Sequence, residues 1–361
     1  MYTVDYMANV KGGVNTGSRG LDNFDAIFSF DGGKLLGAQG LTGRVYLLNN
    51  NGGKPDAGLV GSAQGINNIE VAKATGKLYE AWLQQNLFAD RLSVLGGLYD
   101  LNSEFYVTDS SGLFIHPTYG IGTDFSQSGQ NGPSIFPATS LAVRIKVQPA
   151  QNLYLQAAIF DGAPGATDDL KGTQIEFNNG EGALFAAEAG YSDPHGKLAI
   201  GAWAYSDKFP DHVALNASGS PEKKRSQGFY LIGEQQIFQE AGSENQGLRA
   251  FARIGWADPD VNQFDYAWSA GAVYTGLIPT RDAGQLGLAL SHAHNAPKFR
   301  RMNRLAGTPV KSGETAFELT YSDNLTPWLS LQPDVQYIVD PGTDPVRDDA
   351  VIVGGRLTLT F

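Results

Sequence analysis

The sequence predicts an all-β fold: a 16-stranded antiparallel transmembrane β-barrel. Three observations predict it. About sixteen segments of roughly ten residues alternate apolar and polar side chains, which is the period of a β-strand. After the second segment, the connections largely alternate between short turns and long loops. The chain ends on Phe361, in a segment whose apolar face is opposed by a face that carries Arg356.

The alternating segments run along the whole chain with no break in composition, so we expect a single barrel domain over residues 1–361. Segment 138–148 shows the clearest alternation, because Arg144 and Lys146 are interleaved with valine and isoleucine. No run approaches 18 apolar residues, so no transmembrane helix is predicted. In order, the expected strands are 2–10, 18–30, 40–49, 76–88, 90–100, 138–148, 151–161, 183–192, 196–206, 226–238, 246–257, 263–275, 283–292, 314–322, 327–339 and 350–361.

The connections carry independent information about the same fold. Outer-membrane barrels have short periplasmic turns and long extracellular loops. A soluble β-sandwich gives no reason for this alternation, and a loop as long as 101–137 argues against a compact soluble domain. An even number of strands then places both termini in the periplasm. The long connections are 50–75, 101–137, 162–182, 207–225 and 293–313.

Composition excludes several classes of protein. The chain has no cysteine, which removes disulfides, thiolate metal sites and cysteine nucleophiles. A formal net charge of -11 argues against nucleic acid as a partner. The charged fraction of 17% is low for a soluble protein. No signal peptide is recognisable at Met1–Val4, so we expect a mature or trimmed chain and infer its export.

The side chains expected to face the lumen form a mixed polar and aromatic set. A charge at mid-bilayer costs roughly 2–4 kcal/mol, so charged residues at alternate positions should point inward. Sugar sites use planar hydrogen-bonding groups for hydroxyl pairs and aromatic faces for the sugar ring. Alternatively, Arg and Glu pair across the lumen and keep it rigid. The pore-lining candidates are Arg44, Glu80, Trp82, Tyr99, Asp100, Glu104, Arg144, Lys146, Glu188, Trp203, Glu234, Arg249, Arg253, Glu318 and Arg356.

Several stretches resemble the carbohydrate-selective porins of the OprB family. The longest is the combined motif formed by LYEAWLQQNL at 78–87, RLS at 91–93 and LYDLNSEF at 98–105. NGPSIFP at 131–137 is similar to the end of that family's third extracellular loop, and 318–321 with 332–337 resemble its penultimate strands.

The resemblance implies a monomeric barrel in a Gram-negative outer membrane that passes monosaccharides such as glucose. It also implies that loop 101–137 folds inward and narrows the pore. The expected partners are the sugar, outer-membrane lipid with lipopolysaccharide, and the barrel assembly machinery. The sequence predicts no cofactor.

Other functions are weighed from the residues. Clustered Arg144, Lys146, Arg249 and Arg253 favour a general or anion-preferring diffusion porin. A structural barrel or adhesin would have its lumen plugged by loop 101–137. His292 and His294 form at most a two-ligand pair, and the calcium-like run at 258–262 is followed by Gln263 where a glycine belongs. With no inward-facing histidine expected, an enzyme is not predicted.

Overall fold

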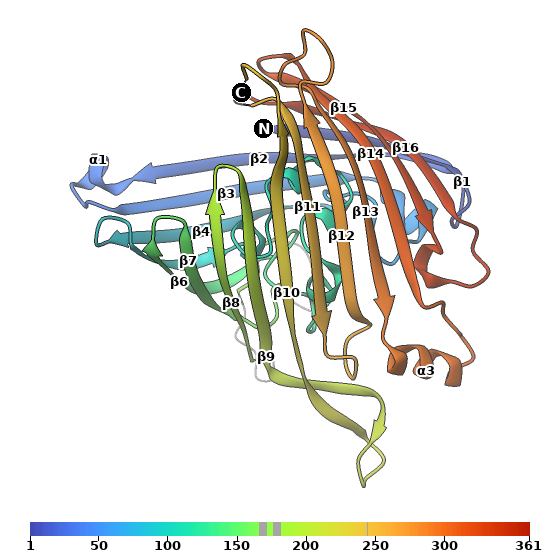
Figure 1. Cartoon of the computed structure of the whole chain (residues 1–361). Helices are drawn as coiled ribbons and strands as arrows, with labels where there is room; N and C mark the ends of the chain where they lie inside the picture. The colour runs from blue at the N-terminus through green and yellow to red at the C-terminus, as the bar shows by residue number, and fades with distance from the viewer. Residues whose placement is uncertain (166–171, 176–181, 244) are drawn as a thin grey trace.

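The computed structural model describes residues 1–165, 172–175, 182–243 and 245–361. Within them, sixteen strands close into one antiparallel barrel (Figure 1). The strands are β1 (Tyr2–Lys11), β2 (Gly17–Asp31), β3 (Leu41–Gly52), β4 (Thr75–Leu87), β5 (Leu92–Tyr99), β6 (Ser140–Ala150), β7 (Leu153–Asp161), β8 (Ala183–Asp193), β9 (Gly196–Leu215), β10 (Pro221–Gln239), β11 (Gly247–Ala257), β12 (Phe264–Thr275), β13 (Gln285–Asn295), β14 (Gly313–Thr326), β15 (Leu329–Val339) and β16 (Ala350–Leu359).

The barrel closes between its first and last strands. β1 pairs with β16 in a register that sets Tyr2 opposite Leu359 and Asp5 opposite Arg356. Closure gives every strand two neighbours, so the backbone N–H and C=O groups find partners without water, as a membrane requires. The predicted fold class is therefore confirmed. Both termini lie at one end of the barrel, opposite the long β9–β10 hairpin (Figure 1).

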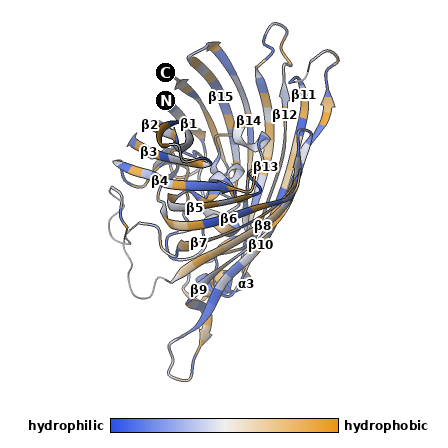
Figure 2. Cartoon of the chain, turned by 90° about the vertical axis from the view of Figure 1, so that its left-hand side faces the viewer, coloured by the Kyte–Doolittle hydropathy of each residue, from blue (hydrophilic) through white to orange (hydrophobic). Residues whose placement is uncertain are grey.

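The two faces of the wall differ in chemistry as the alternation predicts. On β6, Val143 and Ile145 are 49% and 48% exposed on the outside, whereas Arg144 between them is 2% exposed. Figure 2 shows orange, hydrophobic residues along much of this wall, and blue, hydrophilic residues where the β9–β10 hairpin leaves it. The outer face therefore suits lipid, and the ionised groups are turned inward.

Two predicted loops contain regular structure that the sequence did not predict, while most of the predicted connection 162–182 lies outside the described residues. Segment 207–225, predicted as a loop, is mostly a continuation of β9 and β10 into a hairpin. The alternation of apolar and polar side chains is absent there, because a hairpin that projects beyond the membrane has water on both faces. Segment 293–313 contains the helix α3 (Pro297–Leu305), which was not predicted.

The remaining helical segments are short. No helix among the described residues is long and apolar enough to cross a membrane. The short segments are α1 (Gly32–Leu36), η1 (Asp56–Val60), η2 (Leu101–Ser103), η3 (Ser110–Leu113), η4 (Pro117–Tyr119), α2 (Thr123–Ser126) and η5 (Pro341–Thr343).

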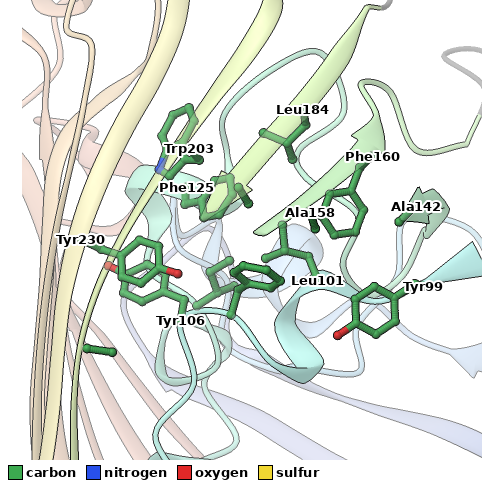
Figure 3. Close-up of a cluster of buried hydrophobic side chains, with 14 of the residues drawn as sticks. Tyr99, Leu101, Tyr106, Phe125, Ala142, Ala158, Phe160, Leu184, Trp203 and Tyr230 are labelled. Atoms are coloured by element: carbon green, nitrogen blue, oxygen red, sulfur yellow. The ribbon is translucent and has the colours of Figure 1, made fainter. Parts of the chain in front are cut away.

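Among the residues that the structure describes, two connections enter the barrel and fill much of it. The long inward loop, residues 100–139, joins β5 to β6 and packs its aromatic side chains against β5–β11. Figure 3 shows Phe125 lying against Trp203, and Tyr106 lying against Tyr230. The short inward loop, residues 53–74, joins β3 to β4 and buries Leu59, Val60 and Ile66 against β1, β2 and β14–β16.

Candidate functional site

Three wall carboxylates hold the backbone of the long inward loop. Glu188, Glu234 and Glu318 project from β8, β10 and β14 and are at most 6% exposed. They accept hydrogen bonds of 2.7 to 3.0 Å from the backbone N–H groups of residues 106, 109, 110, 115 and 116. A loop inside a barrel is not paired with a strand, so its backbone N–H groups lack the carbonyl acceptors of a sheet. These carboxylates are the acceptors instead.

Arg253 of β11 donates hydrogen bonds to backbone carbonyl groups of the same loop. Its guanidinium is buried and donates to the backbone oxygens of residues 106, 118, 119 and 120, with a distance of 2.8 Å to Gly120. Close to it, the loop's Asp124 approaches Gly255, where a Cβ would lie 2.0 Å from the Asp124 carboxylate. The absence of a side chain at Gly255 therefore lets the loop reach the wall.

The short inward loop is held in the same manner. Glu314 of β14 accepts hydrogen bonds from the backbone of Ala63 at 2.7 Å and Gln64 at 3.0 Å. Arg356 of β16 pairs with Asp5 through two hydrogen bonds of 2.7 and 2.8 Å and donates to Asn68 at 2.6 Å. The wall residues Asp5 and Glu314 were not among the sequence candidates, although the alternation of β1 and β14 marks both as inward.

The two inward loops also contact each other. The Asn68 N–H donates to the Ile115 carbonyl at 2.9 Å, and the Gln127 side-chain amide donates to the Ala63 carbonyl at 2.7 Å. From the sequence, only segment 101–137 was expected inside the barrel. The short loop was missed because hydrogen bonds from side chains to an irregular backbone leave no periodic pattern in the sequence.

A polar cavity stays open between the long inward loop and β6–β9. Its volume is roughly 350 Å³, and its lining includes Glu104, Asp109, Lys146, Tyr154 and Lys197. A second hollow of about 160 Å³ adjoins it and shares Glu104, Lys146 and Gln148. Lys197 was also missed, although it alternates with the outward Leu198 and Ile200.

Glu104 is the ionic centre of this cavity. The Arg144 guanidinium donates to its carboxylate at 2.7 Å, the Lys146 ammonium lies 3.3 Å from it, and the Tyr99 hydroxyl donates at 2.5 Å. Burial alone would raise the pKa of Glu104, but Arg144 and Lys146 hold this pKa below its ordinary value. Unlike the anchoring carboxylates, Glu104 is 24% exposed, and Lys146 is 30% exposed.

An aromatic ring faces two of the cavity's cations. The ammonium groups of Lys146 and Lys197 lie 5.4 and 5.6 Å from the centre of the Tyr154 ring. This arrangement gives a ring face beside hydrogen-bond donors and acceptors within one cavity.

A further group of candidates lies on β3 and β4. The Arg44 guanidinium stacks 5.6 Å from the Trp82 ring centre and lies 3.3 Å from the Glu80 carboxylate. Glu80 also accepts a hydrogen bond from the Asp100 backbone N–H at 3.2 Å. Among the described residues, the buried Nε of Arg44 and Nε1 of Trp82 have no hydrogen-bond partner.

The structure divides the fifteen sequence candidates into groups. Glu188, Glu234, Arg253, Glu318 and Arg356 hold the inward loops. Trp203 is 3% exposed, and its ring face is covered by Phe125 at a centre-to-centre distance of 4.7 Å.

Arg249 lies at the rim and donates to the Pro194 carbonyl at 2.7 Å. The rest cluster around Glu104 or Trp82, and contact with sugar stays a prediction for all fifteen.

Residues 15–361 match the family model described as carbohydrate-selective porin, OprB family. Porin B of Pseudomonas aeruginosa is 25% identical, over 100% of this chain and 86% of that protein.

Solved structures show the same barrel. The high-pH structure of Pseudomonas putida OprB has a TM-score of 0.86 at 20% identity and covers 100% of this chain and 93% of its own. The outer membrane channel DcaP of Acinetobacter baumannii has a TM-score of 0.57 at 10% identity, covering 100% and 95% of the two chains.

Proposed function

The chain belongs to the OprB family of carbohydrate-selective porins, and we propose that it passes monosaccharides such as glucose through the cavity around Glu104. Members of this family are channels of the Gram-negative outer membrane and not enzymes. The proposal concerns which carbohydrate passes and which residues it meets.

The observation that carries this proposal is the charge balance of the cavity. Its lining holds two acids, Glu104 and Asp109, and two bases, Lys146 and Lys197. A balanced site offers donors and acceptors to hydroxyl groups without a net field that would select an ion. Its volume of roughly 350 Å³ lies at the small end of the range of about 300–1,000 Å³ typical of ligand sites, which suits one sugar ring better than a longer chain.

The Arg44–Trp82 pair supplies a second contact along the lumen. The partly exposed Arg44 guanidinium suits sugar hydroxyls, and the partly exposed Trp82 ring offers an apolar face. Conduction requires sites that bind and then release, so several weak contacts serve better than one strong site. Each contact replaces part of the hydration shell of the sugar as it passes.

We propose an orientation with both termini in the periplasm and the β9–β10 hairpin outside the cell. In support, the termini share one end of the barrel with short turns such as 88–91 and 151–152 (Figure 1). We also propose that a monomer conducts, because the ring of strands and the cavity are completed within one chain.

Planar-bilayer recording on the purified protein tests the function. We expect glucose to reduce the ion current in a saturable manner, a disaccharide to reduce it less, and the reversal potential to show little anion preference. Liposome swelling should be faster with glucose than with a disaccharide. A current that glucose does not change, together with strong anion selectivity, would support a general anion-preferring pore instead.

A further inference from the structure

The outer wall of the barrel carries an apolar groove over β6–β11. Its volume is roughly 890 Å³, larger than the cavity around Glu104. The floor is made by Ala157, Ala187 and Ala202, which are lateral neighbours on β7, β8 and β9. Larger side chains on both sides, including Ile145 and Phe229, are 48% exposed and form the walls.

An aromatic pair borders this groove on β10 and β11. The Trp256 ring stacks on the Phe229 ring with centres 4.8 Å apart, and Gln227 and Asp258 lie two residues from these rings, at the end of the groove. Amphipathic rings favour the level of the lipid headgroups, so this end marks the membrane–water boundary. In the orientation proposed above, it is the boundary of the outer leaflet.

Beyond that boundary, the outward faces of β9 and β10 become basic. Lys208 lies directly opposite Arg225, and Lys223 follows two residues away on β10. All three are exposed, and among the described residues none of them has an ion-pair partner. At about 3.3 Å per residue, Arg225 lies only about 7 Å along the strand from Gln227 in the groove.

Acids of the same hairpin do not neutralise these cations. Asp211 and Glu222 lie 3.8 and 4.0 Å from the ammonium of Lys224, which belongs to the opposite face of the hairpin. Lys298 of α3 also pairs with Asp211, at 2.6 Å. The outward cations are therefore available to a partner in the membrane surface.

We propose that this wall binds lipopolysaccharide, with an acyl chain in the groove and a phosphate of its lipid A headgroup on Lys208, Lys223 and Arg225. The groove matches a saturated chain, the cations match phosphate, and their order along the strands matches the order of tail and headgroup. Lipopolysaccharide occupies the outer leaflet, whereas a second copy of this chain would bring the same three cations against each other or against apolar wall. The inference rests on the proposed orientation.

Binding of purified lipid A to the full-length protein in detergent, followed by native mass spectrometry, tests the proposal. Replacing Lys208, Lys223 and Arg225 by serine together should weaken lipid A binding on the order of a hundredfold. A matched control replaces Lys11, Lys34 and Arg301, also two lysines and one arginine that are exposed, and should leave binding unchanged. Ala187→Leu with Ala202→Leu should weaken binding by filling the groove, without changing the glucose response of the current.

Several outcomes would overturn the proposal. The triple variant could bind lipid A as tightly as the wild type does. The wild type could also bind dephosphorylated lipid A, or phosphatidylglycerol, as tightly as it binds lipid A. A dimer or trimer that the groove variants dissociate would assign the groove to a second copy of the chain. Ser218→Cys labelling on intact cells reports the orientation separately, and the glucose response reports the channel function, so the two failures are distinguishable.

Discussion

Glu188 and Glu104 are carboxylates of the same lumen with different surroundings. Glu188 is buried and accepts hydrogen bonds from the Tyr106 backbone and from the hydroxyls of Tyr154 and Tyr230. Glu104 is partly exposed, and its main partners are the cations of Arg144 and Lys146. The difference teaches that a wall carboxylate such as Glu188 holds the loop, whereas Glu104, which belongs to the loop, brings a charge to the opening.

The same division extends to the arginines. Arg253 is enclosed by loop carbonyls, whereas Arg44 is half-buried beside a tryptophan. Wall charges on β8, β10, β11 and β14 thus anchor the long inward loop, whereas Lys146 of β6 and Lys197 of β9 border the open cavity. Variants of the two groups should therefore affect different observables.

The largest effect is expected from Arg253→Met. It leaves several buried carbonyls of the long inward loop without a donor, which should lower the free energy of unfolding by about 3–5 kcal/mol. The loosened loop should also raise single-channel conductance and weaken sugar selectivity. Arg249→Met on the same strand is the matched control, because Arg249 contacts only the rim. Equal stability and conductance in the two variants would contradict the anchoring role.

The two tryptophans should separate stability from sugar binding. Trp203→Ala removes a buried ring stacked on Phe125 and should cost about 3–5 kcal/mol in unfolding free energy. Trp82→Ala should cost less, because Trp82 is only partly buried, yet it should weaken the glucose effect on the current about threefold to tenfold. Denaturant titration and glucose titration of the current measure the two effects. The division would be wrong if Trp82→Ala left the glucose response intact.

A smaller effect is expected from pH, through Asp124 in the long inward loop. Burial raises the pKa of this carboxyl to about 7, despite the hydrogen bond from Tyr106. The protonated form therefore favours the docked loop. The stabilisation of the docked loop by protonated Asp124 is fully present below the ordinary pKa of 3.8. It is lost as the pH rises through about 7.

Current noise from loop motion should accordingly be higher at pH 8 than at pH 5. Asp124→Asn keeps a neutral side chain and should reduce the difference, and Asp124→Asn with Asp100→Asn should reduce it further, because burial also raises the pKa of Asp100 to about 7. Noise that falls between pH 5 and pH 8 would reverse the predicted sign.

The strands were predictable from sequence because lipid and water impose opposite chemistry on alternate residues, as at Arg144 between Val143 and Ile145. The sequence did not show which inward acids anchor the loop and which line the cavity. Glu188 and Glu104 are equally plausible for either role until the path of the long loop is known. The short inward loop was missed for the related reason that Glu314 holds irregular backbone and Arg356 binds the side chain of Asn68 in that loop. The β9–β10 hairpin extends past the membrane, where alternation no longer marks a strand.

The central claim is that sugar passes through the open cavity at Glu104 and does not contact the anchoring carboxylates. Glucose titration of the ion current through Glu104→Gln measures this most directly, with Lys34→Gln as an exposed control. The account predicts a glucose affinity about tenfold weaker for Glu104→Gln, equivalent to about 1.4 kcal/mol, and no change for the control. An unchanged glucose affinity in Glu104→Gln, with the barrel folded and conducting, would contradict it.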